Sequence, residues 1–178
     1  MKEVPRGQPD GRGVRVAVLR ARFNRGIVDG LCDGAEAALT EMGVTHAVVA
    51  DVPGAFELPL AARAAASSGR FDAIVALGAV IRGDTDHYEH IAREAASGLQ
   101  RAALDTGVPV AFGVLTCESE AQAVQRSRPG SGNKGAEAAR AAVAMALTLR
   151  TLRRSGQPQR AQRTTKSTQR KRISQRRK

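Results

Sequence analysis

The chain has 178 residues, of which 42 % are hydrophobic and only 3 % are aromatic, which fits one globular domain with an aliphatic core and excludes a disordered or fibrous protein. Its apolar stretches are far shorter than the roughly 20 residues of a membrane-spanning helix, and residues 1–13 contain no hydrophobic signal region, so we expect a cytoplasmic protein without membrane contact. The net charge of +11 is typical of a nucleic-acid binder, but this excess is unevenly distributed.

The positive charge is confined to the C-terminal end. Residues 151–178 hold 11 Lys and Arg and no Asp or Glu, which leaves 17 basic and 17 acidic residues in the rest of the chain. This end has no aromatic and few large apolar residues, so it cannot bury enough surface to offset the entropy lost on ordering. We therefore expect a flexible leader over residues 1–13, a folded domain over 14–154 and a disordered basic tail over 155–178.

Two strands and two helices are predicted in the first half of the folded domain. Residues 14–19 (VRVAVL) are β-branched and follow a glycine-rich leader, as in a buried strand. Apolar residues then recur every three or four positions over 27–42, which indicates one face of a helix. A second strand is predicted at 47–50, and a second helix at 56–67, after a Pro-Gly break.

The second half continues the alternation. Residues 72–81 (DAIVALGAVI) are continuously apolar, which is typical of a strand covered on both faces by helices. A helix over 87–104, a fourth strand over 109–115 and helices near 119–126 and 134–152 follow. Strands that alternate with helices of this length imply right-handed crossovers, so we predict an α/β three-layer sandwich around a four-stranded parallel sheet.

The loop at residues 82–87 (RGDTDH) joins the most apolar strand to a long helix. In parallel sheets, sites form where strands end and helices begin, and here loop N–H groups and the positive end of the helix dipole point outward together, as in an anion site. Thr85 can donate its hydroxyl, and Gly83 permits close backbone approach to an anion. Alternatively, Asp84, Thr85 or Asp86 simply caps the helix, and the spacing leaves both interpretations open.

His87 falls in the first turn of that helix. The dipole there disfavours the imidazolium and favours the neutral ring that a general base needs. The alternative is a structural role, which is more common for a single histidine. His90 lies one turn further and could face the same way, but the sequence offers no third ligand, so we expect no metal site.

Three other patterns carry no function. Gly130, Gly132 and Gly135 have the spacing of a dinucleotide-binding fingerprint, but they follow a helix rather than a strand. The segment around Lys134 lacks the residue order of a phosphate-binding P-loop. The two cysteines are far apart, on a predicted helix and a strand end, so they form neither a disulfide framework nor a paired-cysteine zinc site.

Four segments, in order and at consistent separations, resemble lumazine synthase. They are ARFNRGIVDGL (21–31), VPGAFELPLAA (52–62), ALGAVIRGDTDHYEHI (76–91) with SGLQ (97–100), and PVAFGVLTCES (109–119) followed by GNKGAEAA (132–139). They span nearly all of residues 14–150 and fall at the strand ends described above. The resemblance implies a flavodoxin-like fold and assembly into homopentamers, which in some members form closed icosahedral shells.

The resemblance also implies a role for each site residue. One group of residues would bind a pyrimidine ring and its ribityl chain, and a second group would bind the substrate phosphate. A third group, partly from the neighbouring subunit, would complete the pocket, and His87 would transfer protons. The first group is Phe23, which stacks on the ring, the segment Ala55, Phe56 and Glu57, and the backbone of Ala79, Val80 and Ile81. The second is Asp84 and Thr85 with Arg126, and the third is Phe112 and Lys134; Phe112 and Arg126 would come from the neighbour.

The implied reaction condenses 5-amino-6-(D-ribitylamino)uracil with 3,4-dihydroxy-2-butanone 4-phosphate to 6,7-dimethyl-8-ribityllumazine in riboflavin biosynthesis. An amine attacks a ketone to give an imine, phosphate leaves by elimination, and the ring closes with loss of water. No step is a redox step, so no cofactor is expected. This chain departs from the family pattern at Asp86, where many members have proline and where the carboxylate adds negative charge beside the phosphate site, and in its basic tail.

Two other functions stay open from sequence alone. A shell or scaffold protein could bind RNA or another polyanion through residues 155–178, unless that tail is only solvated. A pocket that binds a flavin or a pyrimidine without catalysis would use the same fold.

Overall fold

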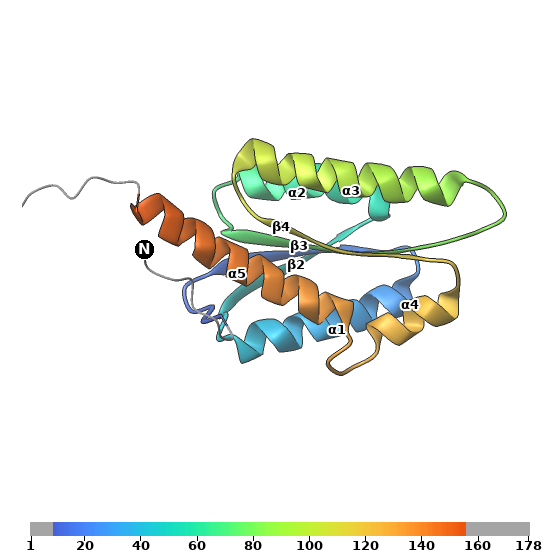
Figure 1. Cartoon of the computed structure of the whole chain (residues 1–178), viewed down its shortest axis with the longest axis horizontal. Coiled ribbons are helices and arrows are strands. Elements are labelled where there is room, and N and C mark those ends of the chain that lie inside the picture. The colour runs from blue at the N-terminus through green and yellow to red at the C-terminus, as the bar shows by residue number, and fades with distance from the viewer. Residues whose placement is uncertain (1–8, 156–178) are drawn as a thin grey trace, which may run out of the picture.

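The structure is a computed structural model and describes residues 9–155. These residues form one parallel sheet with helices on both faces. The strands are β1 (Arg15–Ala21), β2 (His46–Val52), β3 (Ala73–Ile81) and β4 (Val110–Cys117), in the order β2-β1-β3-β4. Helices α1 (Arg25–Glu41), α4 (Glu120–Ser127) and α5 (Lys134–Ser155) cover one face, and α2 (Leu58–Ser67) and α3 (His87–Thr106) cover the other (Figure 1). The predicted three-layer, flavodoxin-like sandwich is confirmed.

Strands β1, β2 and β4 extend further toward their carboxyl ends than the apolar pattern predicted, whereas β3 ends at Ile81 as predicted. β1 and β2 stay in register as far as Ala21 and Val52, and β3 and β4 as far as Ile81 and Cys117. Arg20 and Asp51, which interrupt the apolar runs, are register partners whose side chains form a 2.8 Å hydrogen bond. Polar residues that pair across two strands therefore continue the ladder beyond the hydrophobic segments.

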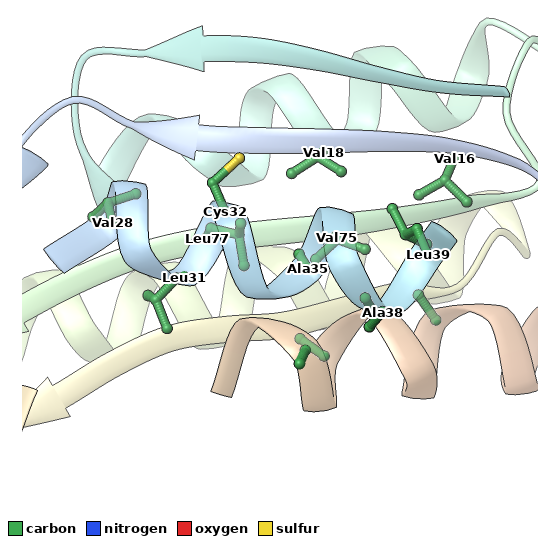
Figure 2. Packing of buried hydrophobic residues seen from close by; sticks show 14 of the residues in the cluster. Val16, Val18, Val28, Leu31, Cys32, Ala35, Ala38, Leu39, Val75 and Leu77 are labelled. Carbon is green, nitrogen blue, oxygen red and sulfur yellow. The ribbon is translucent and has the colours of Figure 1, made fainter. Parts of the chain in front are cut away.

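The core follows from the central position of β3. Residues 73–80 are all buried, because helices cover both faces of the strand. Figure 2 shows one half of the core, where residues of α1 pack with β1 and β3 and α5 runs alongside; labelled there are Val16, Val18, Val28, Leu31, Cys32, Ala35, Ala38, Leu39, Val75 and Leu77. Each fully buried Val or Leu contributes roughly 1.5–3 kcal/mol, so this cluster is a main source of stability.

Both cysteines lie in this half of the core. Cys32 and Cys117 are free and buried. Burial, followed by the charge of Glu36, raises the pKa of the Cys32 thiol to about 11, so this thiol is protonated and unreactive at neutral pH.

The edge strand β2 differs from the rest of the sheet. Residues His46 to Asp51 are exposed in the single chain, although four consecutive members are apolar. Val48 is 36 % exposed and Val49 is 39 % exposed. Unpaired, apolar strand edges of this kind are normally covered by another part of a protein or by a second chain.

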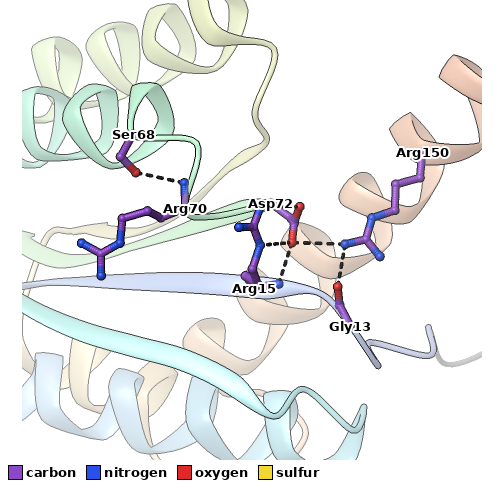
Figure 3. A network of polar contacts seen from close by, with 6 residues as sticks. All are labelled: Gly13, Arg15, Ser68, Arg70, Asp72 and Arg150. Carbon is purple, nitrogen blue, oxygen red and sulfur yellow. Dashed lines mark hydrogen bonds and ion pairs between the residues drawn. The ribbon is translucent and has the colours of Figure 1, made fainter.

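A polar network closes the amino end of the sheet. Figure 3 shows Asp72, which accepts hydrogen bonds from the backbone N–H of Arg15 at 2.8 Å and from its Nε at 3.0 Å. Arg150 of α5 lies 3.1 Å from the same carboxylate and donates to the carbonyl oxygen of Gly13 at 2.7 Å. These contacts join β1, β3 and α5 at the amino-terminal ends of the strands, opposite to the carboxyl ends where sites form.

Most of residues 1–13 and of residues 155–178, predicted as a leader and a tail, lie outside the described residues. Between residues 9 and 155, no helix combines the length and the apolar character that crossing a membrane requires.

Candidate active site

A pocket of about 370 Å³ opens at the carboxyl edge of the sheet. We call it the main pocket, and it brings together most of the site residues predicted from the sequence. Its lining comprises Phe23, Asn24, Gly54, Ala55, Phe56, Glu57, Ala79, Val80, Ile81, Gly83, Thr85, His87, Tyr88 and Ile91. All of the residues that were expected to bind the pyrimidine and its ribityl chain line this pocket.

Two exposed phenylalanines mark this pocket. Phe23 follows the end of β1, and Phe56 lies in a 3-10 turn, η1 (Ala55–Glu57), that follows β2. They are 73 % and 55 % exposed, although aromatic rings in small domains normally lie in the core. β1 and β2 are neighbours, so their ends carry both rings to one place. Exposed aromatic faces suit stacking on a flat heterocycle.

Small residues and main chain make up much of the rest of the lining. Ala55, Ala79 and Val80 are buried, so they present little side-chain bulk to the pocket. Glu57 is the only acidic side chain among the lining residues, and it is half-buried. Backbone groups and one carboxylate can therefore hydrogen-bond to the edge of a polar ring and to hydroxyl groups.

The loop before α3 forms the opposite end of the main pocket. Asp86 occupies the N-cap position of α3, but its side chain makes no capping hydrogen bond. The capping alternative is therefore wrong for Asp86. The carbonyl oxygen of Asp86 accepts from Glu89 N–H at 3.0 Å; the first N–H groups of the helix, together with its positive dipole end, face outward. Thr85 and Gly83 line the pocket beside this helix end, whereas Asp84 does not.

The histidine predicted as the proton-transfer residue lies next to this helix end. His87 is exposed and lines the main pocket, while His90, one turn along, does not. Among residues 9–155, no group of three or more His, Cys, Asp and Glu side chains is arranged to hold a metal ion. His87 thus faces the pocket as a single imidazole.

Arg82, the first residue of this loop, has other partners. Its Nη1 donates to Glu118 at 3.0 Å, and its guanidinium lies 5.7 Å from the centre of the Tyr88 ring. The hydrogen bond and the charge of Glu118 raise the pKa of Arg82. Because Arg82 is engaged by these two partners, we expect a different arginine to bind a phosphate held at Thr85.

Three further predicted residues lie in a second hollow, of about 420 Å³, which we call the β4 hollow. It contains Phe112, which is 47 % exposed, together with Arg126 and Lys134. Lys134 Nζ pairs with Glu137 at 2.8 Å, and Arg126 Nη1 donates to the carbonyl oxygen of Gln122 at 2.9 Å. Within one chain, the structure does not bring these three residues into the main pocket.

Sequence reasoning missed two asparagines that shape these regions. Asn24 lines the main pocket, and Asn133, which is buried, caps α5 by accepting from Ala136 N–H at 3.0 Å. Asn133 directly precedes the helix predicted over 134–152, and Asn24 directly precedes α1, which begins two residues before the predicted apolar spacing. Both stand at the usual position of a capping asparagine. That signal was available in the sequence.

The fold and this site together define an α/β small-molecule site of the flavodoxin-like class, at the carboxyl edge of a parallel sheet. Residues 13–150 match the family model described as 6,7-dimethyl-8-ribityllumazine synthase. The match covers most of the chain and confirms the resemblance seen in the sequence. The protein belongs to the 6,7-dimethyl-8-ribityllumazine synthase family.

Proposed function

We propose that this chain is a 6,7-dimethyl-8-ribityllumazine synthase, a transferase of riboflavin biosynthesis. It condenses 5-amino-6-(D-ribitylamino)uracil with 3,4-dihydroxy-2-butanone 4-phosphate, and phosphate and water are released. The observation that carries the proposal is the convergence of two exposed phenylalanines, the end of β3 and His87 in one pocket. Family membership supports the same reaction.

The two ends of the main pocket suit the two substrates. The pyrimidine ring stacks on Phe23, its edge bonds to the backbone of Ala79 to Ile81, and Glu57 accepts hydrogen bonds from the ribityl hydroxyls. The phosphate binds at Thr85 and the start of α3, where N–H groups and the helix dipole favour an anion.

The chemistry needs positioning and proton transfer. The primary amine of the pyrimidine attacks the ketone to form an imine with loss of water, phosphate leaves by elimination, and the ribitylamino nitrogen attacks the remaining carbonyl and closes the ring with loss of a second water. Holding the two reactants in register is worth up to roughly 7–11 kcal/mol of the barrier. His87, the first residue of α3, lines the pocket at its phosphate end and moves the protons.

The site is completed by a second copy of the chain. Phe112, Arg126 and Lys134 lie together in the β4 hollow, apart from the main pocket of their own chain. A homo-oligomer, pentameric as the resemblance implies, brings the β4 hollow of one subunit to the main pocket of the next. The exposed apolar strand β2 is consistent with burial between subunits.

Incubation of purified protein with both substrates tests the proposal. We expect lumazine fluorescence to rise faster than in the uncatalysed mixture. His87→Ala should lower turnover by roughly ten- to a thousandfold, while the control His90→Ala, outside the pocket lining, should retain it. Pyrimidine binding without any turnover would instead identify a binding protein, and an unchanged rate in His87→Ala would remove His87 from the mechanism.

A second proposed activity, polyanion binding, rests on the uneven charge. All 11 charges of the excess lie in residues 151–178, and an oligomer would multiply them. Phosphate neutralisation by such a segment gives strongly salt-dependent binding without sequence preference. A truncation after residue 155 tests this: the full chain should bind a single-stranded RNA oligonucleotide at low salt and the truncated chain should not. Equal binding by both chains would contradict the activity.

A further inference from the structure

We infer that Asn24 is a positioning residue for the pyrimidine: its side-chain amide ties the segment that carries Phe23 to the end of β3. The inference rests on the proposed function. It concerns a residue that lies beside the reacting groups and acts through Phe23.

The backbone of Asn24 is unusual. Among the described residues, it is the only non-glycine with a positive φ, at 54° with ψ 46°. This left-handed conformation is unfavourable for most L-residues, and asparagine tolerates it better than nearly all others. The chain therefore turns sharply between the end of β1 and the start of α1, directly after Phe23.

The side chain of Asn24 bonds away from its own helix. At the N-cap of α1 an asparagine normally accepts a hydrogen bond from the first turn, but Asn24 makes no such bond. Its Nδ2 instead donates to the carbonyl oxygen of Ala79 at 2.8 Å. Register pairing between β1 and β3 ends at Arg20 and Leu77, so Ala79 lies beyond the ladder and Asn24 supplies the donor that β1 no longer provides.

Phe23 is consequently held between two hydrogen bonds to two different strands. On one side, Arg22 N–H donates to the carbonyl oxygen of Val52 in β2 at 2.9 Å; on the other, Asn24 reaches Ala79 in β3. The Phe23 ring itself is 73 % exposed, so core packing does not set its position. The flanking bonds set it, and through them the separation between the stacking ring and the Ala79 wall.

This arrangement acts on one substrate more than on the other. Phe23 and Ala79 both belong to the pyrimidine end of the main pocket, whereas Thr85 lies on the loop before α3. Loss of the Asn24 tether leaves the ring free to move and raises the entropy cost of binding the pyrimidine. The phosphate substrate keeps its contacts.

Two variants separate the tether from the turn. Asn24→Gly keeps the left-handed turn and removes the amide, while Asn24→Asp keeps the size and the turn but presents a carboxylate to the Ala79 carbonyl. We expect both to raise the KM for the aminopyrimidine roughly three- to tenfold, with the KM for dihydroxybutanone phosphate within about twofold of wild type and little loss in Tm.

Calorimetric titration with the aminopyrimidine alone gives a second readout that does not need turnover. Its Kd should weaken by the same roughly three- to tenfold factor in both variants. An unchanged Kd in Asn24→Gly would overturn the inference. An equal rise of the KM values for both substrates would also overturn it, because such a rise indicates a merely structural role for Asn24. Wild-type protein that binds the pyrimidine without turnover would overturn the proposed function and leave the role of Asn24 to be decided by this Kd.

Discussion

Replacing Asn133 should destabilise the junction between α1, α4 and α5 more than any other change of a single polar side chain in the described chain. Asn133 is 1 % exposed. Its Nδ2 donates to the carbonyl oxygens of Gly30 at 2.9 Å, Ser127 at 2.8 Å and Arg128 at 3.2 Å, and its Oδ1 accepts from Ala136 N–H at 3.0 Å. One amide thus caps α5 and fastens the preceding loop to α1.

The magnitude follows from these bonds. Loss of an N-cap costs about 1 kcal/mol, and carbonyl oxygens left without a donor in a buried site cost about 1–3 kcal/mol more. We expect Asn133→Ala to lower the free energy of unfolding by about 2–4 kcal/mol. For a domain of this size that corresponds to a fall in Tm of roughly 5–15 °C.

Asn133→Asp is the matched variant, measured by urea or thermal unfolding at fixed protein concentration. It keeps an oxygen for the cap but turns a carboxylate toward three carbonyl oxygens. If the donated bonds dominate, Asn133→Asp is destabilised at least as much as Asn133→Ala. A Tm for Asn133→Asp close to wild type would refute this reasoning, because the cap alone would then account for the stability.

Three further predictions concern charge and close packing. Burial alone would raise the pKa of Asp72, but hydrogen bonds from Arg15 and the nearby arginine charges outweigh it and hold that pKa below its ordinary value. Asp72→Asn should therefore lower Tm at pH 7, and the difference should begin to shrink as the pH falls below about 4 and vanish only once the pH is below the lowered pKa of Asp72. A difference that persists in acid would contradict this assignment. Asp86→Asn should lower the KM for dihydroxybutanone phosphate about two- to fivefold at low salt and less at high salt, and a KM that rises would count against a phosphate site there. In Gly135→Ala the new Cβ would overlap the backbone carbonyl of Leu31, whereas Gly132→Ala points into open space, so only the first variant should lose Tm or soluble yield.

The sheet could be predicted because β3 is apolar throughout and the helices around it have regular apolar spacing. Strand ends were harder to predict, since Arg20 and Asp51 resemble loop residues until their pairing across β1 and β2 is known. The structural role of Gly135 was equally hard to predict from the sequence. The sequence excluded a nucleotide fingerprint at that position, but its packing against Leu31 depends on how two distant helices meet.

The site was predictable in part. The family resemblance, whose segments fall at strand ends, selected Phe23, the η1 turn and the loop before α3, and these converge, whereas Phe112, Arg126 and Lys134 do not join them within one chain. Spacing could not separate an anion site from a capped helix at Asp86, since this depends on a side-chain rotamer. Nor could it show that Asn24 turns away from its own helix toward Ala79, because that bond spans two elements that are distant in sequence.

Complementation between two impaired variants tests the central claim, a catalytic pocket shared by two copies of the chain. His87→Ala damages the main pocket, and Arg126→Ala damages the β4 hollow. Random co-assembly of equal amounts should leave about a quarter of the sites with both native residues, so lumazine formation should return to about a quarter of the wild-type rate. Mixed assemblies that are as inactive as either variant alone would contradict the shared site.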